Sequence, residues 1–309
     1  MRYQMHHVGY VDRLLPPLWH IQRRQVPAQL EVCVDAGGLT NVAIACLAAQ
    51  QVNGVGGSWR VGTMVAANSG RPGGACSASS TGGRTLETEK LHAHHKTQEE
   101  DVVSNWLLTA AEDNPGADPM QVMDRLFART VSRQWGMSHP ERSDCDTLQN
   151  IDYRDAKPAK YADAWVVRGV WLSRKEVAPV RRFDFSTQYP TSLYFVSGPN
   201  AGAQGRDPRS STRRTFNEEA AATYGIFREG VKAAVRAGLL AMAMDGCDVA
   251  LLAGVATGLY AGDHRSTIRS EYAALVNEIL AEPMQHEGIS SAPHTLGECF
   301  ARVVWTVLE

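Results

Sequence analysis

Apolar and polar positions follow two different periods along the chain, and the changes of period predict an alternation of strands and helices. Short β-prone or fully apolar runs predict strands at residues 30–34, 61–67, 164–172, 193–197, 249–253 and 300–308. Apolar residues at helical spacing predict helices at residues 41–51, 98–107, 119–134, 216–242 and 266–281. This alternation predicts an α/β fold, with a mostly parallel sheet between helices on both faces.

Glycine-rich stretches follow two of the predicted strands. Residues 70–84 consist almost entirely of Gly, Ser, Ala and Thr, and a second glycine-spaced stretch follows Ala253. In open parallel sheets, ligands bind at the loops that leave the carboxyl ends of strands. Both stretches are therefore expected to border a ligand site. Without an internal repeat or a clear linker, residues 1–309 are interpreted as a single domain, with an N-terminal extension at about 1–29.

Composition narrows the choice of partners. The 309 residues are 44% hydrophobic and 21% charged, with a formal net charge of -2. This balance gives no long-range attraction to nucleic acid or to an anionic membrane, so neither is an expected partner. Residues 1–13 are polar and lack the apolar core of a secretory signal. Six cysteines without a CxxC pair argue against a disulfide framework and a thiolate zinc site. A cytoplasmic location is expected.

The first candidate for chemistry combines the end of the second predicted strand with the following helix. Asn68 can offer a donor and an acceptor to a sugar hydroxyl, and Gly73-Gly74 lets the backbone approach a ligand closely. Downstream, Gln98-Glu99-Glu100 opens a helix with two carboxylates. One could hold a sugar while the other transfers a proton, as cleavage of a glycosidic bond requires. The plainer alternative is that acidic residues are favoured in the first turn of any helix.

The second candidate is the loop after the strand at 249–253. It comprises Gly254, Val255, Ala256, Thr257, Gly258, Leu259 and Tyr260. A glycine-rich loop that leads from a strand towards a helix exposes backbone N–H groups that suit a diphosphate. The loop matches neither the P-loop pattern nor the GxGxxG fingerprint, and a tight strand-to-helix connection is the alternative.

Taken together, these stretches resemble the microbial type of poly(ADP-ribose) glycohydrolase, whose catalytic domain is a macrodomain. The resemblance runs in the order of the family over roughly residues 30–309. It rests on five stretches: residues 65–68 with 72–74 and 98–100; 165–174; 197–200, Ser-Gly-Pro-Asn in place of the family's Ala-Pro-Asn; 248–262; and the last strand at 303–307.

The resemblance implies an ADP-ribosyl glycohydrolase that needs no cofactor and no metal. Glu100 would protonate the leaving group at the anomeric carbon of the distal ribose, and Glu99 would hold that ribose. The residues expected to bind the substrate are Asp35, Asn68, Gly73, Gly74, Gln98, Asn200 and the loop 254–260. Asp101 points about a third of a turn away from Glu100 and is expected to be exposed to solvent.

The sequence also departs from the family. Ala75 follows the two glycines where the family has a third, and residues 75–97 form an enlarged loop before Gln98. The substrate is therefore either a polymer of ADP-ribose or a single ADP-ribose on a protein side chain. Two other hypotheses stay open: a macrodomain that binds ADP-ribose without cutting it, and another nucleotide-processing α/β protein. His92, His94 and His95 with Cys76 fit no metal-ligand pattern.

Overall fold

A computed structural model describes residues 5–7, 23–34, 59–67, 98–112, 164–176, 182–202, 216–284 and 293–307. The strands are β1 (Met5–His7), β2 (Leu30–Val34), β3 (Val61–Ala66), β4 (Ala164–Glu176), β5 (Arg182–Val196), β6 (Val249–Leu252) and β7 (Arg302–Val307). The helices are α3 (Gln98–Glu112), α8 (Glu218–Ala222), α9 (Tyr224–Met244) and α10 (Arg265–Leu280), with the 3-10 helices η7 (Leu259–His264) and η8 (Leu296–Cys299).

All of these strands belong to a seven-stranded sheet with the order β1-β4-β5-β3-β6-β7-β2. The strands β5, β3, β6, β7 and β2 run parallel to one another. The strand β4 runs antiparallel to both β5 and β1. The α/β fold with a mostly parallel sheet that the sequence predicted is therefore confirmed.

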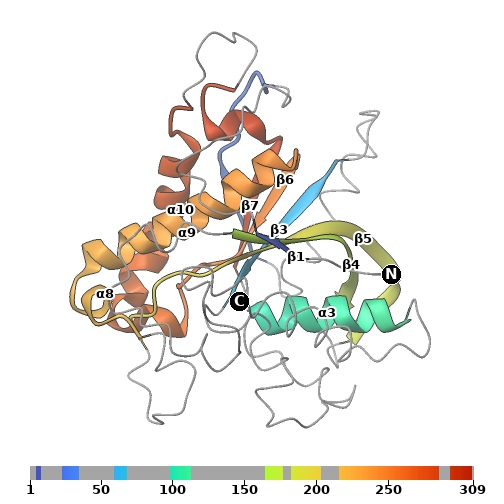
Figure 1. Ribbon diagram of the computed structural model, residues 1–309, viewed down its shortest axis with the longest axis horizontal. Helices are drawn as coiled ribbons and strands as arrows, with labels where there is room; N and C mark the ends of the chain where they lie inside the picture. Colours follow the sequence, from blue (N-terminus) through green and yellow to red (C-terminus); the bar gives the residue numbers. More distant parts are fainter. Residues whose placement is uncertain are drawn as a thin grey trace.

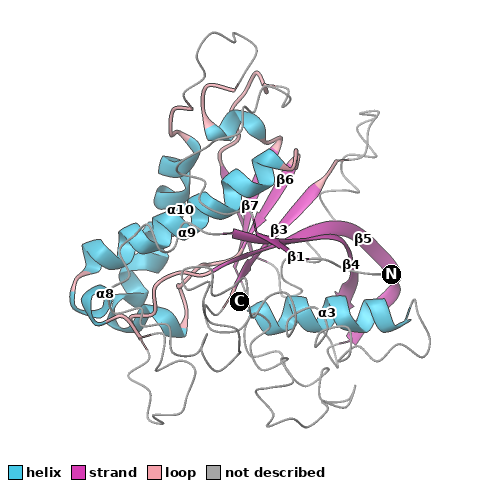
Figure 2. Cartoon of the chain, in the orientation of Figure 1, coloured by secondary structure: helices cyan, strands magenta, loops and turns pink. Residues whose placement is uncertain are grey.

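Helices cover both faces of the sheet, with α9 and α10 on one side and α3 on the other (Figures 1 and 2). Alternate residues of a strand point to opposite faces, so a central strand must be apolar along its whole length. In β6, Val-Ala-Leu-Leu is buried at every position. The side chains of Ala250 and Leu252 join the core under α9 and α10. Burial on both faces explains the continuous apolar runs in the sequence.

The largest differences from the prediction concern three elements. The strand β5 begins at Arg182 instead of 193, and with β4 it forms a long antiparallel hairpin. The predicted helix at 216–242 is divided at Thr223, whose φ of -130° and ψ of 110° are extended. Asn217 starts α8 by accepting a hydrogen bond from the amide of Ala220. The short strand β1 lies within the stretch that was interpreted as an extension.

Two predictions fall elsewhere in the chain: the helices at 41–51 and 119–134 lie outside the described residues. The thiol of Cys247 is buried. Burial raises the pKa of the thiols of Cys247 and Cys299 to about 12, which keeps both protonated near neutral pH.

None of the helices that the structure describes is both long enough and apolar enough to cross a membrane.

Candidate functional site

The course of the chain through the sheet marks one edge as the candidate site. The neighbouring strands β3 and β6 run parallel, and the chain leaves them in opposite directions. After β3 it continues to α3, β4 and β5, and after β6 it continues to α10 and β7. Connections that diverge from adjacent parallel strands leave a crevice at the carboxyl ends, where ligands bind in α/β proteins. The candidate site is therefore the edge of the sheet where β3 and β6 end.

Gln98 fixes the start of α3 at this edge of the sheet. Its side-chain amide nitrogen donates to the carbonyl of Met64, and its side-chain oxygen accepts from the amide of Ala66, both at 3.1 Å. The amide of Ala67 donates to the carbonyl of Val196 in β5. Because the backbone groups of successive residues in a strand point to alternate sides, the N–H and C=O groups of the even-numbered residues of β3 point towards its other neighbour, β6. Pairing between β3 and β6 ends at Thr63 and Leu251. The Gln98 carboxamide thus continues the hydrogen bonding of β3 beyond the end of the β6 pairing.

Glu99 and Glu100 are the next two residues of α3, so the backbone places them in the first turn, directly after this clamp. Their side chains lie outside the described part of the molecule. Asp101, which was expected to be exposed to solvent, instead forms an ion pair with Lys175 of β4. The Asp101 side chain is 20% exposed and that of Lys175 only 4%. The expectation was wrong because the long β4–β5 hairpin brings a lysine against the first turns of α3.

The loop at residues 254–260 leaves the end of β6 in a tight turn. The amide of Thr257 donates to the carbonyl of Gly254 at 3.3 Å, and Ala256 has a φ of +52°. A positive φ at the third position is typical of a type II turn and is costly for a residue other than glycine. A Cβ on Gly254 would lie 2.4 Å from the side-chain oxygen of Thr257, so the turn requires glycine there.

Two side chains of α10 hold this loop. The Tyr272 hydroxyl donates to the carbonyl of Ala253 at 2.6 Å and accepts from the amide of Val255 at 3.2 Å. Burial raises the pKa of this phenol, so its proton stays available for donation. The ring packs against Trp305 of β7, with centroids 4.6 Å apart. From the other end of the loop, the carbonyl of Thr257 accepts from Nε of Arg269 at 3.0 Å.

These bonds leave the loop with unused donors. Among the described residues, no acceptor pairs with the backbone amides of Ala256, Gly258 or Leu259. Free amides in a turn that contains a left-handed residue can surround an anion. The loop therefore has the backbone chemistry that the sequence predicted for holding a diphosphate, and that role stays a prediction.

A second segment, residues 197–202, follows β5 and packs against the loop. The amide of Ala201 donates to the carbonyl of Tyr260 at 2.7 Å, and Gly262 adopts a φ of +53°. A Cβ on Gly202 would meet the carbonyl oxygen of Leu259 at 1.9 Å. Asn200, a predicted substrate-binding residue, is 2% exposed, and its side chain accepts from the amide of Gly202 at 3.3 Å. Asn200 shapes this contact, and its binding role stays a prediction.

The structure thus gathers part of the predicted site at one edge of the sheet: Gln98, the backbone of Glu99 and Glu100, Asn200 and the loop 254–260. Asp35, Asn68, Gly73, Gly74, the enlarged loop at 75–97 and the three histidines lie outside the described residues. Within the described residues, no group of His, Cys, Asp and Glu side chains could hold a metal ion. Sequence reasoning missed Tyr272, Arg269 and Lys175, since each is an isolated residue at ordinary helix or strand spacing.

Comparison with models of known protein families finds no match, and a search of curated proteins also finds none. Among solved structures, poly(ADP-ribose) glycohydrolase from Thermomonospora curvata bound to the inhibitor ADP-HPD is similar. The match has a TM-score of 0.50 and 14% sequence identity, and covers 98% of this chain and 78% of that chain. Poly(ADP-ribose) glycohydrolase from Deinococcus radiodurans in complex with ADP-ribose matches with a TM-score of 0.48 and 13% identity, over 99% of this chain and 87% of that chain.

The first of these similarities establishes the class of fold. The chain has the macrodomain-like α/β fold of a bacterial poly(ADP-ribose) glycohydrolase. The resemblance stated from the sequence is confirmed at this level. At 14% identity it is a likeness of fold, and the chemistry has to be argued from the residues of this chain.

Proposed function

We propose that this protein is a hydrolase that cleaves the glycosidic bond of an ADP-ribose unit attached to a protein or to another ADP-ribose. Glu100 is the acid that donates a proton to the leaving group as its bond to the anomeric carbon breaks. Water then adds to that carbon. Glu99 holds the hydroxyls of the distal ribose, and the loop 254–260 binds the diphosphate.

One observation carries this proposal. Gln98 bonds to the backbone of β3 at the point where β3 and β6 separate, and the two glutamates follow it directly. The acids and the glycine-rich loop are thereby brought to the same edge of the sheet from positions more than a hundred residues apart in the sequence. A proton donor beside a cradle of backbone amides is the arrangement that hydrolysis of a sugar linked to a diphosphate needs.

The fold supports the same class of substrate. A protein with this fold is a poly(ADP-ribose) glycohydrolase whose structure contains the inhibitor ADP-HPD. Fold likeness does not select the linkage that is cut. Polymeric ADP-ribose and ADP-ribose on a protein side chain are therefore both substrates to be tried.

The test is the substitution Glu100→Gln, assayed on poly(ADP-ribose) and on mono-ADP-ribosylated proteins, with calorimetric titration of free ADP-ribose. Loss of a general acid lowers kcat by about 10²- to 10⁴-fold. Glu112→Gln is the matched control, because this exposed glutamate lies at the far end of the same helix. We expect the first variant to bind ADP-ribose with little turnover and the control to match the wild type.

Each unexpected result has a distinct meaning. Equal hydrolysis by Glu100→Gln and the wild type would refute the catalytic assignment. Binding of ADP-ribose by a wild-type protein that cuts no substrate would favour a non-catalytic ADP-ribose-binding protein. Absence of any ADP-ribose binding would refute the proposal as a whole.

A further inference from the structure

The helix that carries the two glutamates is joined to the β4–β5 hairpin by a stripe of polar side chains. Asp101, Asn105 and Thr109 recur every four residues and therefore lie along one face of α3. Asn105 is 2% exposed and Thr109 is fully buried. A buried polar stripe is unusual on a helix that packs against a sheet, because each polar group has to find a partner there.

Asn105 makes the most constrained of these contacts. Its side-chain nitrogen donates to the carbonyl of Ser173 at 2.8 Å, and its side-chain oxygen accepts from the amide of the same residue at 2.8 Å. Thr109 adds bonds to the side chains of Asn105, at 3.1 Å, and Ser173, at 2.7 Å. Two hydrogen bonds to one peptide segment fix both the distance and the rotation of the helix against β4.

Lys175 makes the second contact, one turn nearer to the glutamates. Its ammonium group is bonded to a carboxylate oxygen of Asp101. The ladder between β4 and β5 shifts register between Ser173 and Arg174, immediately before Lys175. Register shifts of this kind bend a strand and re-aim its side chains. The irregularity therefore lies at the point where the hairpin meets the first turns of α3.

We propose that the Asn105–Ser173 and Asp101–Lys175 contacts form a lock, which sets the position and rotation of α3 and so places Glu99 and Glu100 against the substrate. Lys175 and Asn105 are positioning residues, which act on the reaction only through α3. This inference rests on the proposed function. Gln98 fixes the end of α3 at β3, and the lock fixes its rotation from the hairpin. Because the loop 254–260 is held separately by Tyr272 and Arg269, the lock controls turnover and leaves diphosphate binding unchanged.

The test compares Lys175→Met with Lys175→Arg and with Arg174→Met. Methionine keeps the aliphatic stem and removes the charge, and arginine restores a cation. Arg174 is the exposed neighbour on the same strand and provides the control. The measurements are kcat and KM on the substrate that the wild type cleaves, and the Kd of free ADP-ribose. Hydrogen exchange of the amides of residues 98–103 is measured without ligand.

Lys175→Met is expected to lower kcat by about ten- to a hundredfold, because a displacement of roughly 1 Å costs on the order of a hundredfold. The Kd of ADP-ribose should rise much less than kcat falls, because the loop 254–260 keeps its own anchors and only the Glu99 contact moves with α3. The binding stoichiometry should stay at the wild-type value, whereas partial unfolding would lower it. Lys175→Arg should recover most of the rate, and Arg174→Met should match the wild type. Exchange at residues 98–103 should rise only in Lys175→Met.

The proposal of a lock would be refuted if kcat were unchanged in Lys175→Met. It would also be refuted if ADP-ribose affinity fell as much as the rate. Unchanged exchange at residues 98–103 would also overturn it, whether or not the wild type is active. Raised exchange in a protein that hydrolyses nothing would refute the proposed function and leave the lock standing. The two proposals can therefore fail separately.

Discussion

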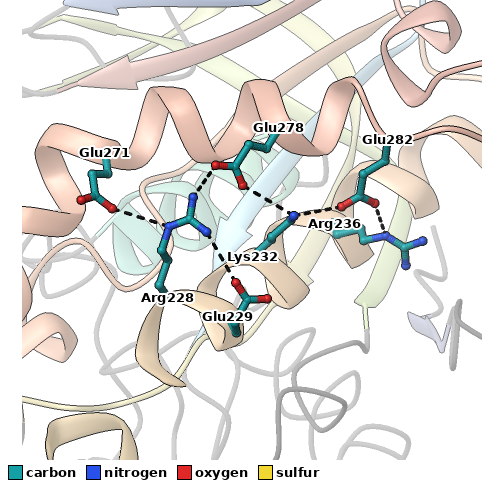
Figure 3. Close-up of polar contacts among 7 residues, drawn as sticks. All are labelled: Arg228, Glu229, Lys232, Arg236, Glu271, Glu278 and Glu282. Carbon is teal, nitrogen blue, oxygen red and sulfur yellow. Dashed lines mark hydrogen bonds and ion pairs between the residues drawn. The ribbon is translucent and has the colours of Figure 1, made fainter. Parts of the chain in front are cut away.

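The two helical layers are held to the same sheet in different ways. Along the middle of α9, small and apolar residues meet the sheet, and Gly238 lies against Met64 and Val196. Ion pairs join α9 and α10 outside the core (Figure 3), and Asp245 at the end of α9 pairs with Arg168 of β4, whose side chain is 46% exposed. The layer of α3 instead buries carboxamides, hydroxyls and one ion pair between helix and strand.

The two kinds of contact have different effects: apolar packing attaches a helix to the sheet, and directional polar bonds also fix its position. Apolar contact has no preferred direction, so a helix held by it can shift slightly at little cost. A buried hydrogen bond is directional, and breaking it leaves an unpaired group, so it fixes a position. The α9–α10 layer has buried polar bonds as well, at Tyr194 and Tyr272, and the Tyr272 bond lies at the strand end that borders the candidate site. Directional bonds hold both α3 and the loop 254–260, and the proposed reaction requires these two parts to keep a fixed relative position.

Asn105→Leu should have the largest effect on the free energy of unfolding, because it removes the directional bonds of the α3 layer. Leucine fills a similar volume but leaves the amide and the carbonyl of Ser173 without partners. We expect a loss of about 2–4 kcal/mol in the free energy of unfolding, because each unsatisfied buried group costs about 1–3 kcal/mol. Urea denaturation followed by circular dichroism measures it. A loss below about 1 kcal/mol would mean that water or another side chain takes over these bonds.

Tyr272→Phe removes a single hydroxyl from the other layer. The carbonyl of Ala253 and the amide of Val255 lose a shared partner but keep the bond between them, so we expect a destabilisation of roughly 1–1.5 kcal/mol. ADP-ribose affinity should fall as well, because the loop that supplies the free amides loses its anchor. Calorimetry and urea denaturation on the same protein measure both effects. Unchanged affinity would contradict the role of Tyr272 in shaping the loop.

Gly238→Ala tests the apolar layer directly. The added Cβ would lie 2.6 Å from the terminal carbon of Met64 and 3.0 Å from Val196. Overpacking costs about 1–3 kcal/mol, while alanine gains about 1 kcal/mol of helix propensity, so we expect a net loss of roughly 1 kcal/mol. A shift in thermal midpoint measures the net effect. A more stable variant would show that the end of Met64 moves aside freely.

Arg228→Met should have the smallest effect. Arg228 contacts Glu229, Glu271 and Glu278 on the outside of α9 and α10, as Figure 3 shows. Exposed ion pairs contribute about 0–1 kcal/mol and are screened by salt. The loss should shrink further when urea denaturation is repeated at high ionic strength. A loss as large as that of Asn105→Leu would remove the distinction between the two layers.

The sequence predicted the apolar strands well because burial on both faces leaves a continuous signal. The predicted strand at 61–67 differs from β3 by one residue, and that at 249–253 differs from β6 by one residue. The predicted strand at 30–34 also coincides with β2, although Val32 and Val34 of that strand are exposed. The first part of β5 could not be predicted, since polar residues and Pro190 interrupt its pattern. Its pairing with β4 is long-range, and single-sequence periodicity carries no record of such a partner.

The position of the candidate site could be predicted in part, because it follows from the predicted parallel strands. Loops after β3 and β6 could be placed at one edge, because the carboxyl ends of parallel strands meet there. The supporting side chains could not. Asn105 occupies a polar position in the helical pattern of residues 98–107, yet it is buried, because its partner is the backbone of Ser173. A polar residue that pairs with a distant strand has the same local pattern as one that faces water.

The sheet order also has a consequence for how the molecule is made. The strand β2 pairs only with β7 among the described strands, and a bidentate contact between Glu31 and Arg302 spans 271 positions of sequence. During synthesis, the residues between β2 and β7 must therefore all be made before the partner of β2 emerges from the ribosome. Closure of so long a loop is entropically slow. In that interval its strand edge and two exposed valines, Val32 and Val34, are open to chaperones and to other nascent chains.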